Sequence, residues 1–128
     1  RKDFTGGWPD DEKNGFTAAG RTDAQNEIYN YLQHLLNWRK SKEAIHTGKL
    51  THFIPENNVY VYFRHHDNET VMIILNNNDN SQTLQTERFK EMMKGYRTGN
   101  EIISQTEIKD LNKIHIPKKS AMIIELKQ

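Results

Sequence analysis

The sequence predicts a mainly β protein, in which an antiparallel β-sandwich follows a loop and one amphipathic helix. Residues 1–21 hold four of the seven glycines and show no apolar period, which is typical of a long loop. Residues 22–40 carry apolar side chains at helical spacing, and from Lys49 onward the apolar period changes to two. Short strands that alternate with turns about every 8–12 residues are typical of a sandwich.

Composition and charge exclude several classes of protein. The 18 Lys and Arg residues nearly cancel the 17 Asp and Glu residues, so no large basic field is present and nucleic acid is not expected as a partner. The absence of cysteine excludes a disulfide framework, a Cys-bound metal and a Cys nucleophile. The longest apolar runs, such as residues 71–75, are far shorter than the roughly 20 residues that span a bilayer. We therefore expect no membrane span, and the first residues do not resemble a signal peptide.

The helix over residues 22–40 has a start signal and one apolar face. Thr22 and Gln25 have the spacing of a capping box. The apolar stripe consists of Ile28, Tyr31, Leu32, Leu35 and Leu36. Apolar stripes of this kind are rarely left exposed to water, so we expect the helix to pack against the sandwich or a neighbouring chain. A short second turn over residues 42–46 is expected to end at Gly48 in the left-handed cap conformation.

The strands follow from alternation and from turn residues. We expect strands or strand-like pieces over residues 50–54, 59–64, 71–75, 83–84, 101–104, 106–108, 114–116 and 120–126. A helical turn over residues 88–94 is expected to end at Gly95. The many asparagines between these segments are turn formers.

Two clusters invite a metal-site interpretation, and in both the structural interpretation is favoured. His65-His66-Asp67 contains ligand types, but adjacent strand residues point to opposite faces, so a solvated hairpin turn is preferred. The run from Asn76 through Asn78 to Asn80 has the spacing of a calcium loop, yet it lacks the glycine, the charge and the later glutamate of such a loop.

The carboxylates of the first loop are of the residue type that glycoside hydrolysis uses, but the sequence does not show that they are rigidly placed. That chemistry needs two rigid carboxyl groups roughly 5–10 Å apart, one on each side of the glycosidic bond. Loop carboxylates do not meet this requirement by themselves, so solvated loop charges are the favoured interpretation. For residues 1–21, the sequence is consistent with either a flexible tail or a functional loop. The residues concerned are Asp3, Asp10, Asp11 and Glu12. Phe4 and Trp8 could offer flat faces to a sugar ring, although packing under the loop is the more common use of such residues.

The same loop carries a resemblance to a known family. The matching segments are residues 1–11, 14–17, 20–22, 25–27, 35–40, 45–50 and 59–64. They resemble the end of the barrel and the following domain in bacterial neopullulanases and cyclomaltodextrinases of the α-amylase superfamily. The usual loop form is Arg-x-Asp-Phe-Pro-Gly-Gly-Trp followed by Asn-Ala-Phe-Thr. Thr5 replaces the proline and Gly15 replaces the alanine, which loosens the loop slightly.

The resemblance implies a domain organisation. Residues 1–48 are expected to be the end of a (β/α)8 catalytic barrel, namely the loop after the eighth strand and the last helix. Residues 49–128 are expected to form a Greek-key-like C-terminal amylase domain, a β-sandwich. The chain begins at Arg1 without a methionine, so we expect it to be a piece of a longer protein.

The resemblance also implies an activity for the parent enzyme and none for this chain. The parent would cleave α-1,4 links in cyclodextrins, pullulan or maltooligosaccharides with retention. Its catalytic Asp, Glu and Asp would all lie on earlier barrel strands. Arg1, Asp3 and Trp8 are the predicted substrate-binding residues, with Arg1 near the donor subsites, where a guanidinium group holds sugar hydroxyls.

The expected partners are an α-glucan substrate and the barrel of the same polypeptide. A homo-oligomer is left open. No cofactor is expected; the resemblance allows a calcium ion in the parent, but the sequence shows no site for one. The cellular compartment is undetermined, because relatives occur in both cytoplasm and periplasm.

Two alternatives remain. A carbohydrate-binding module would use an aromatic platform, for which Tyr60, Tyr62 and Tyr96 are available, although core or cross-strand packing is the more common use of such residues. An unrelated interaction domain is disfavoured by the length of the motif match.

Overall fold

The computed structural model describes residues 3–128 and divides into two compact units, one ending at Trp38 and the other spanning Arg39–Gln128. The first unit holds the N-terminal loop and most of helix α1 (Asp23–Arg39). The second unit holds every strand and two short helices. None of the helices in the described residues is long and apolar enough to cross a membrane.

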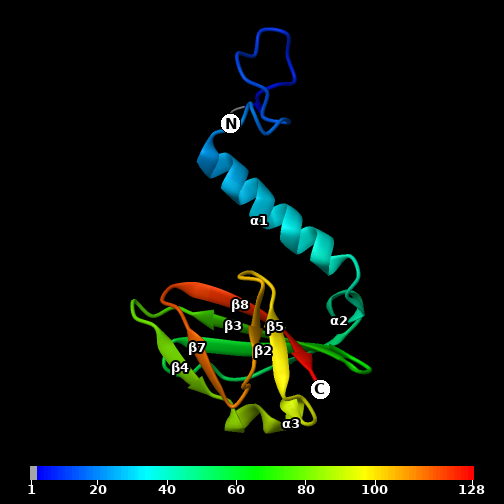
Figure 1. Cartoon of the computed structure of the whole chain (residues 1–128), viewed down its shortest axis with the longest axis vertical. Helices are drawn as coiled ribbons and strands as arrows, with labels where there is room; N and C mark the ends of the chain where they lie inside the picture. Colours follow the sequence, from blue (N-terminus) through cyan, green and yellow to red (C-terminus); the bar gives the residue numbers. More distant parts are fainter. Residues whose placement is uncertain (1–2) are drawn as a thin grey trace. The chain divides into compact units, whose positions relative to one another are not determined.

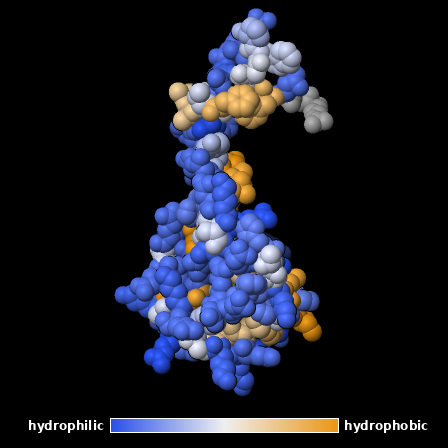
Figure 2. All heavy atoms as spheres, turned by 90° about the vertical axis from the view of Figure 1, so that its right-hand side faces the viewer, coloured by the Kyte–Doolittle hydropathy of each residue, from blue (hydrophilic) through white to orange (hydrophobic). Residues whose placement is uncertain are grey.

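Helix α1 begins at the predicted capping box. The backbone N–H of Thr22 donates to the side-chain oxygen of Gln25 at 2.9 Å, and the N–H of Gln25 donates to the Thr22 hydroxyl at 3.3 Å. No residue of α1 is buried, and Ile28 is 62% exposed. Apolar side chains therefore lie at the surface of this unit (Figure 2). What covers the stripe stays a prediction.

The second unit is an antiparallel β domain of two sheets. The larger sheet has the strand order β1-β2-β3-β8-β5-β6, and the smaller one pairs β4 with β7. The strands are β1 (Lys49–His52), β2 (Val59–His66), β3 (Glu69–Asn76), β4 (Gln82–Gln85), β5 (Thr98–Glu101), β6 (Thr106–Ile108), β7 (Lys113–Ile116) and β8 (Ser120–Lys127). The mainly β, antiparallel fold predicted from the period of two is thus confirmed.

The core lies on the inner face of the larger sheet. Alternate residues of β2 and β3 point inward, so that Phe63 pairs with Met72 and both are fully buried. The smaller sheet lies over this face (Figure 1), and Ile114 and Ile116 of β7 join the same cluster. At one end, Phe89 closes the core from the turn η1 (Glu87–Phe89), which continues into α3 (Lys90–Met93).

Two local expectations were wrong. The segment predicted as a strand over 101–104 is mostly a turn, and β5 lies earlier. The reason is Glu101, whose buried carboxylate accepts the backbone N–H groups of Ile103 and Ser104 and so stabilises a turn there. Gly48 has no left-handed conformation; glycine is needed because a Cβ would lie 2.3 Å from the carbonyl oxygen of Ala44. Gly95, with φ of +90°, has the left-handed conformation expected.

The short helix α2 (Glu43–His46) is held on the outer face of the larger sheet by side chains of the strands. The Glu69 carboxylate accepts the N–H of Ala44 at 2.9 Å, and the Arg64 guanidinium donates to the carbonyls of Ala44 and Ile45 at 3.1 and 3.0 Å. These are the backbone groups that a helix leaves unpaired at its two ends. A lysine just before the helix, Lys42, reaches Glu125 of β8 at 2.5 Å.

Candidate functional site

The N-terminal loop is ordered around one carboxylate. Asp11 accepts the backbone N–H of Gly6 at 2.6 Å and that of Trp8 at 3.1 Å. Because hydrogen bonds from these N–H groups favour the charged form, they lower the pKa of Asp11 below its usual 3.8. Gly6 itself has a φ of +105°, and a Cβ there would lie 2.5 Å from the side-chain oxygen of Asn14. The acidic residue and the glycine of this motif are therefore structural.

Hydrogen bonds and a cation–π contact hold the C-terminal end of the loop against the start of α1. The Arg21 guanidinium donates to the carbonyl of Gly15 at 2.9 Å and to the side-chain oxygen of Asn26 at 2.8 Å, and it stacks 3.9 Å from the centre of the Tyr29 ring. Asn26 in turn donates to the carbonyl of Ala18 at 2.9 Å. The loop is thus a folded element and not a free tail.

The predicted substrate-binding residues occupy different parts of this loop. Arg1 lies outside the described residues. Asp3 is exposed and helps line an open groove of about 580 Å³, between the loop and α1, whose apolar lining includes Phe4, Phe16 and Ile28. Trp8 is 68% exposed and is not part of this lining.

The other loop carboxylates differ in their surroundings. Asp10 and Glu12 are exposed, whereas Asp11 is engaged by the backbone as described. None of the residues from 3 to 128 belongs to a group of three or more His, Cys, Asp or Glu side chains suited to a metal ion.

The side chains of the two clusters that resemble metal sites, residues 65–67 and 76–80, form hydrogen bonds and ion pairs within the β domain. His65 contacts the Thr51 hydroxyl at 3.2 Å, and His66 lies 3.6 Å from Asp67 at the turn after β2. The side-chain amide of Asn76 donates to the carbonyl of Pro117 at 2.7 Å, and its oxygen accepts the backbone N–H of Asn78. The His65 contact joins β1 to β2, the Asn76–Pro117 contact joins the ends of two strands, and the other two contacts belong to turns.

The three tyrosines do not form one platform. Tyr60 and Tyr62 lie side by side on the outer face of β2 with ring centres 5.5 Å apart, opposite Leu75 and Ile73 of β3. Burial, and then the neighbouring Tyr60, raise the pKa of Tyr62 above its usual 10.0. Tyr96 lies elsewhere, where its hydroxyl donates to the Asn68 carbonyl at 3.2 Å. Tyr60 also packs across the strands against His52 of β1, with ring centres 6.3 Å apart.

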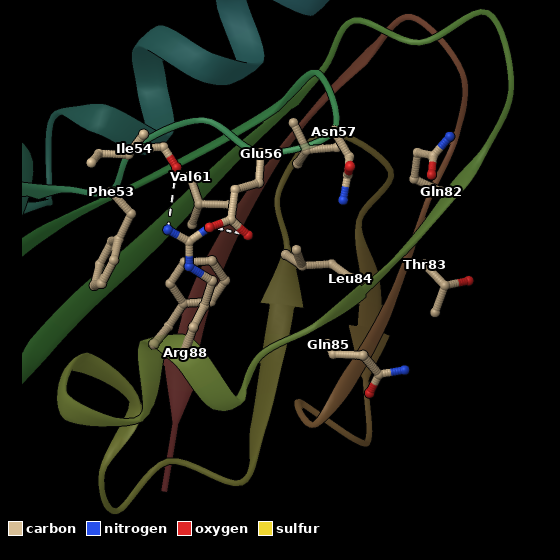
Figure 3. A pocket seen from close by; sticks show the side chains of 12 residues that line it. Phe53, Ile54, Glu56, Asn57, Val61, Gln82, Thr83, Leu84, Gln85 and Arg88 are labelled. Carbon is tan, nitrogen blue, oxygen red and sulfur yellow. Dashed lines mark hydrogen bonds and ion pairs between the residues drawn. The ribbon is translucent and has the colours of Figure 1, made fainter.

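A second hollow, which sequence reasoning missed, lies in the β domain (Figure 3). It encloses about 220 Å³ between the segment after β1 and the edge strand β4. Arg88 lies in it and pairs with Glu56 at 2.7 Å. Its lining comes from four separate stretches of sequence, so no motif identifies it. In the sequence, Gln82, Thr83 and Gln85 show only that this segment is rich in polar residues.

Comparison with known proteins identifies the β domain and its fold. Residues 50–125 match the family described as "Cyclo-malto-dextrinase C-terminal domain". Among solved structures, the α-amylase from Geobacillus thermoleovorans, complexed with acarbose, aligns with 84% of this chain at 17% identity and a TM-score of 0.69. An Anoxybacillus α-amylase aligns with 83% at 21% identity and a TM-score of 0.65. The trehalulose synthase MutB from Pseudomonas mesoacidophila aligns with 78% at 19% identity and a TM-score of 0.63.

These likenesses cover only part of the other proteins. The chain spans 24%, 23% and 18% of the three aligned structures, respectively. At these identities the likeness shows the fold.

Proposed function

Since the chain belongs to the cyclo-malto-dextrinase C-terminal domain family, we propose that it is the non-catalytic C-terminal part of an enzyme that hydrolyses α-1,4-glucosidic bonds. The β domain is the C-terminal domain of an α-amylase-family enzyme. The finer assignment, to a cyclomaltodextrinase or neopullulanase that acts with retention, rests on the loop motif of residues 3–17 and its continuation into α1. In this assignment residues 1–48 complete the catalytic barrel and residues 49–128 support it.

The apolar outer face of the larger sheet is the observation that carries the supporting role. Leu50 and Leu75 are 55% and 40% exposed on it, and the half-buried pair Tyr60 and Tyr62 lies between them. Soluble domains rarely leave exposed apolar side chains clustered on one sheet face open to water. Helix α2 covers the neighbouring part of this face, around the fully buried Val71. We therefore assign the face to the barrel of the same polypeptide.

The surroundings of Asp11 and Glu101 support the proposal that the chain is non-catalytic. A glycosidase needs one carboxyl that holds a proton and a second across the bond. Asp11 has a lowered pKa because backbone N–H groups bind its charged form, and this is the opposite of what a general acid requires. The buried Glu101 is occupied by the backbone of its own turn and of β8.

Arg1, Asp3 and Trp8 remain the proposed substrate contacts in the parent enzyme. The exposed indole of Trp8 has a flat face suited to a pyranose ring, and Asp3 lies beside the open groove. The ordered backbone around Asp11 would hold both at the catalytic face without a large entropy cost.

The proposal is tested by comparing the activity of the purified chain with that of the parent enzyme. The coding sequence upstream of Arg1 is expected to supply two Asp and one Glu at the ends of barrel strands. The parent should release maltose from cyclodextrin, and the purified 128-residue chain should release none. Dose-dependent release of maltose by the purified chain would overturn the assignment.

A further inference from the structure

Asn14 in the N-terminal loop is followed by glycine, and this pair has a covalent chemistry of its own. The backbone nitrogen of the residue after an asparagine can attack the side-chain carbonyl carbon of that asparagine. Glycine permits this attack best, because it has no side chain to shield its nitrogen. Asn14 is the only one of the thirteen asparagines in the sequence that precedes a glycine. It is exposed, so water reaches it.

The structure activates the carbonyl group that would be attacked. The side-chain oxygen of Asn14 accepts the backbone N–H of Phe16 at 3.0 Å. An N–H group placed on a carbonyl oxygen stabilises the negative charge that develops there when a nucleophile attacks the carbon. The attack on Asn14 therefore meets a hydrogen-bond donor that is already in place.

The attacking nitrogen, in contrast, is held back. Gly15 is buried, and its N–H donates to the carbonyl of Thr5 at 3.0 Å. The nitrogen must lose this proton before it attacks, so the hydrogen bond has to break first. The Phe4 ring covers Gly15, since a Cβ built there would lie 3.1 Å from two ring carbons, and it packs on Phe16 with ring centres 4.9 Å apart. Arg21 holds the carbonyl of Gly15 at 2.9 Å.

We propose that Asn14 is a site of spontaneous deamidation, and that the reaction proceeds only when the loop of residues 3–20 opens locally. Once the hydrogen bond between Gly15 and Thr5 is broken, the Gly15 nitrogen loses its proton to solvent and bonds to the side-chain carbon of Asn14. The carbon–nitrogen bond of the side-chain amide breaks and ammonia leaves, which gives a succinimide ring. Water then opens the ring to aspartate or isoaspartate, so water is the only other reactant.

Reclosure of the loop would not restore the original packing. Isoaspartate adds one carbon to the backbone at position 14, where the neighbouring segments leave little space. A Cβ at Gly6 would lie 2.8 Å from the Cα of Asn14, and one at Gly20 would overlap the Asn14 carbonyl. The modified loop therefore loses the close approach of Gly6, whose N–H is one of those that Asp11 binds. This consequence follows from the loop alone and does not rest on the proposed function.

The experiment measures deamidation by peptide mass spectrometry on the 128-residue chain, incubated at mildly alkaline pH in buffer and in urea. Asn14 should be modified first in urea and at least about tenfold more slowly in buffer, because only the open fraction of the loop reacts. Phe4→Ala should raise the rate in buffer several-fold, because it uncovers Gly15. Trp8→Ala is the control, since it removes an exposed aromatic side chain of the same loop, and it should leave the rate unchanged.

A second variant identifies the reacting pair even if Phe4→Ala does not fold. Gly15→Ala shields the attacking nitrogen, so it should slow the modification of Asn14 several-fold in urea, where no fold is present. The modified fraction, separated by ion exchange, should lack the native amide signals of Gly6 and Trp8 in nuclear magnetic resonance spectra. The proposal is overturned if Asn14 reacts equally fast in buffer and in urea, if Phe4→Ala and Trp8→Ala have the same effect in buffer, or if the modified fraction keeps the native signals.

Discussion

Asp11 is the residue on which the geometry of the N-terminal loop depends. Its folded-state pKa is lowered, so its contribution to stability is present above the unfolded value of about 3.9 and is lost as pH falls through the lower folded value. We predict that the amide signals of Gly6 and Trp8 titrate together with a midpoint below 3.8. A midpoint at or above that value would contradict the assignment. Asp11→Asn should abolish the titration.

Glu101 is the second carboxylate with a structural role. It is 3% exposed and accepts N–H groups from Ile103, Ser104 and Ile123, which joins the turn after β5 to β8. Glu101→Ala would leave buried donors unpaired, so we predict that it lowers the free energy of unfolding by about 2–4 kcal/mol.

Urea unfolding of the whole chain measures this change. Glu107→Ala is the matched control, because Glu107 is an exposed glutamate on the adjacent strand β6, and its effect should stay within about 0.5 kcal/mol. Equal effects of the two substitutions would show that the hydrogen bonds of Glu101 add no net stability.

At the level of elements, α2 is too short to be stable by itself and depends on the strands beneath it. Helices of four residues do not persist in water without tertiary contacts. Arg64→Ala removes the donors to the carbonyls of Ala44 and Ile45. We predict a loss of about 1–3 kcal/mol of unfolding free energy and faster hydrogen exchange at the amides of α2.

Arg97→Ala, at an exposed arginine, is the control for this element. Arg64→Lys keeps the charge but not the forked pair of donors, so it should recover only part of the loss. If the amides of α2 exchange equally fast in the original chain and in Arg64→Ala, the hydrogen bonds from Arg64 do not stabilise α2.

The elements also show where sequence patterns succeed. The capping box and the apolar alternation of β2 and β3 are local signals, and each element formed where the signal lies. The signal failed at β5, because Gly99 and Asn100 in the middle of this strand have low strand propensity. There, pairing with β8 and β6 decides the strand.

At the scale of the whole molecule, the outer face of the larger sheet is the surface that we propose contacts the barrel of the parent enzyme. We predict that Leu75→Arg changes the thermal stability of the 128-residue chain little, because Leu75 is partly exposed there, yet lowers the melting temperature of the parent enzyme by several degrees. Burying an unpaired charge at an interface is costly.

His115→Arg serves as control, since His115 is exposed on β7, away from this face. It should leave the chain and the parent equally unaffected. Equal melting temperatures of the parent with and without Leu75→Arg would remove the outer face from the proposed interface.

By itself, the sequence determined the class of fold, the start of α1, most strands and, through the loop motif, the resemblance to cyclomaltodextrinases. These depend on residues close together in the chain, because period and capping act over a few positions. The family match over residues 50–125 agrees with that resemblance.

Only the tertiary structure decided which carboxylates are structural and where the hollow beside Arg88 forms. The roles of Asp11 and Glu101 follow from backbone N–H groups that no composition or spacing reveals. The hollow at Arg88 unites Glu56, Val61 and Gln82 from separate strands and loops. Such hollows depend on which distant segments pack together, and the pairing of strands, rather than any local pattern, sets that arrangement.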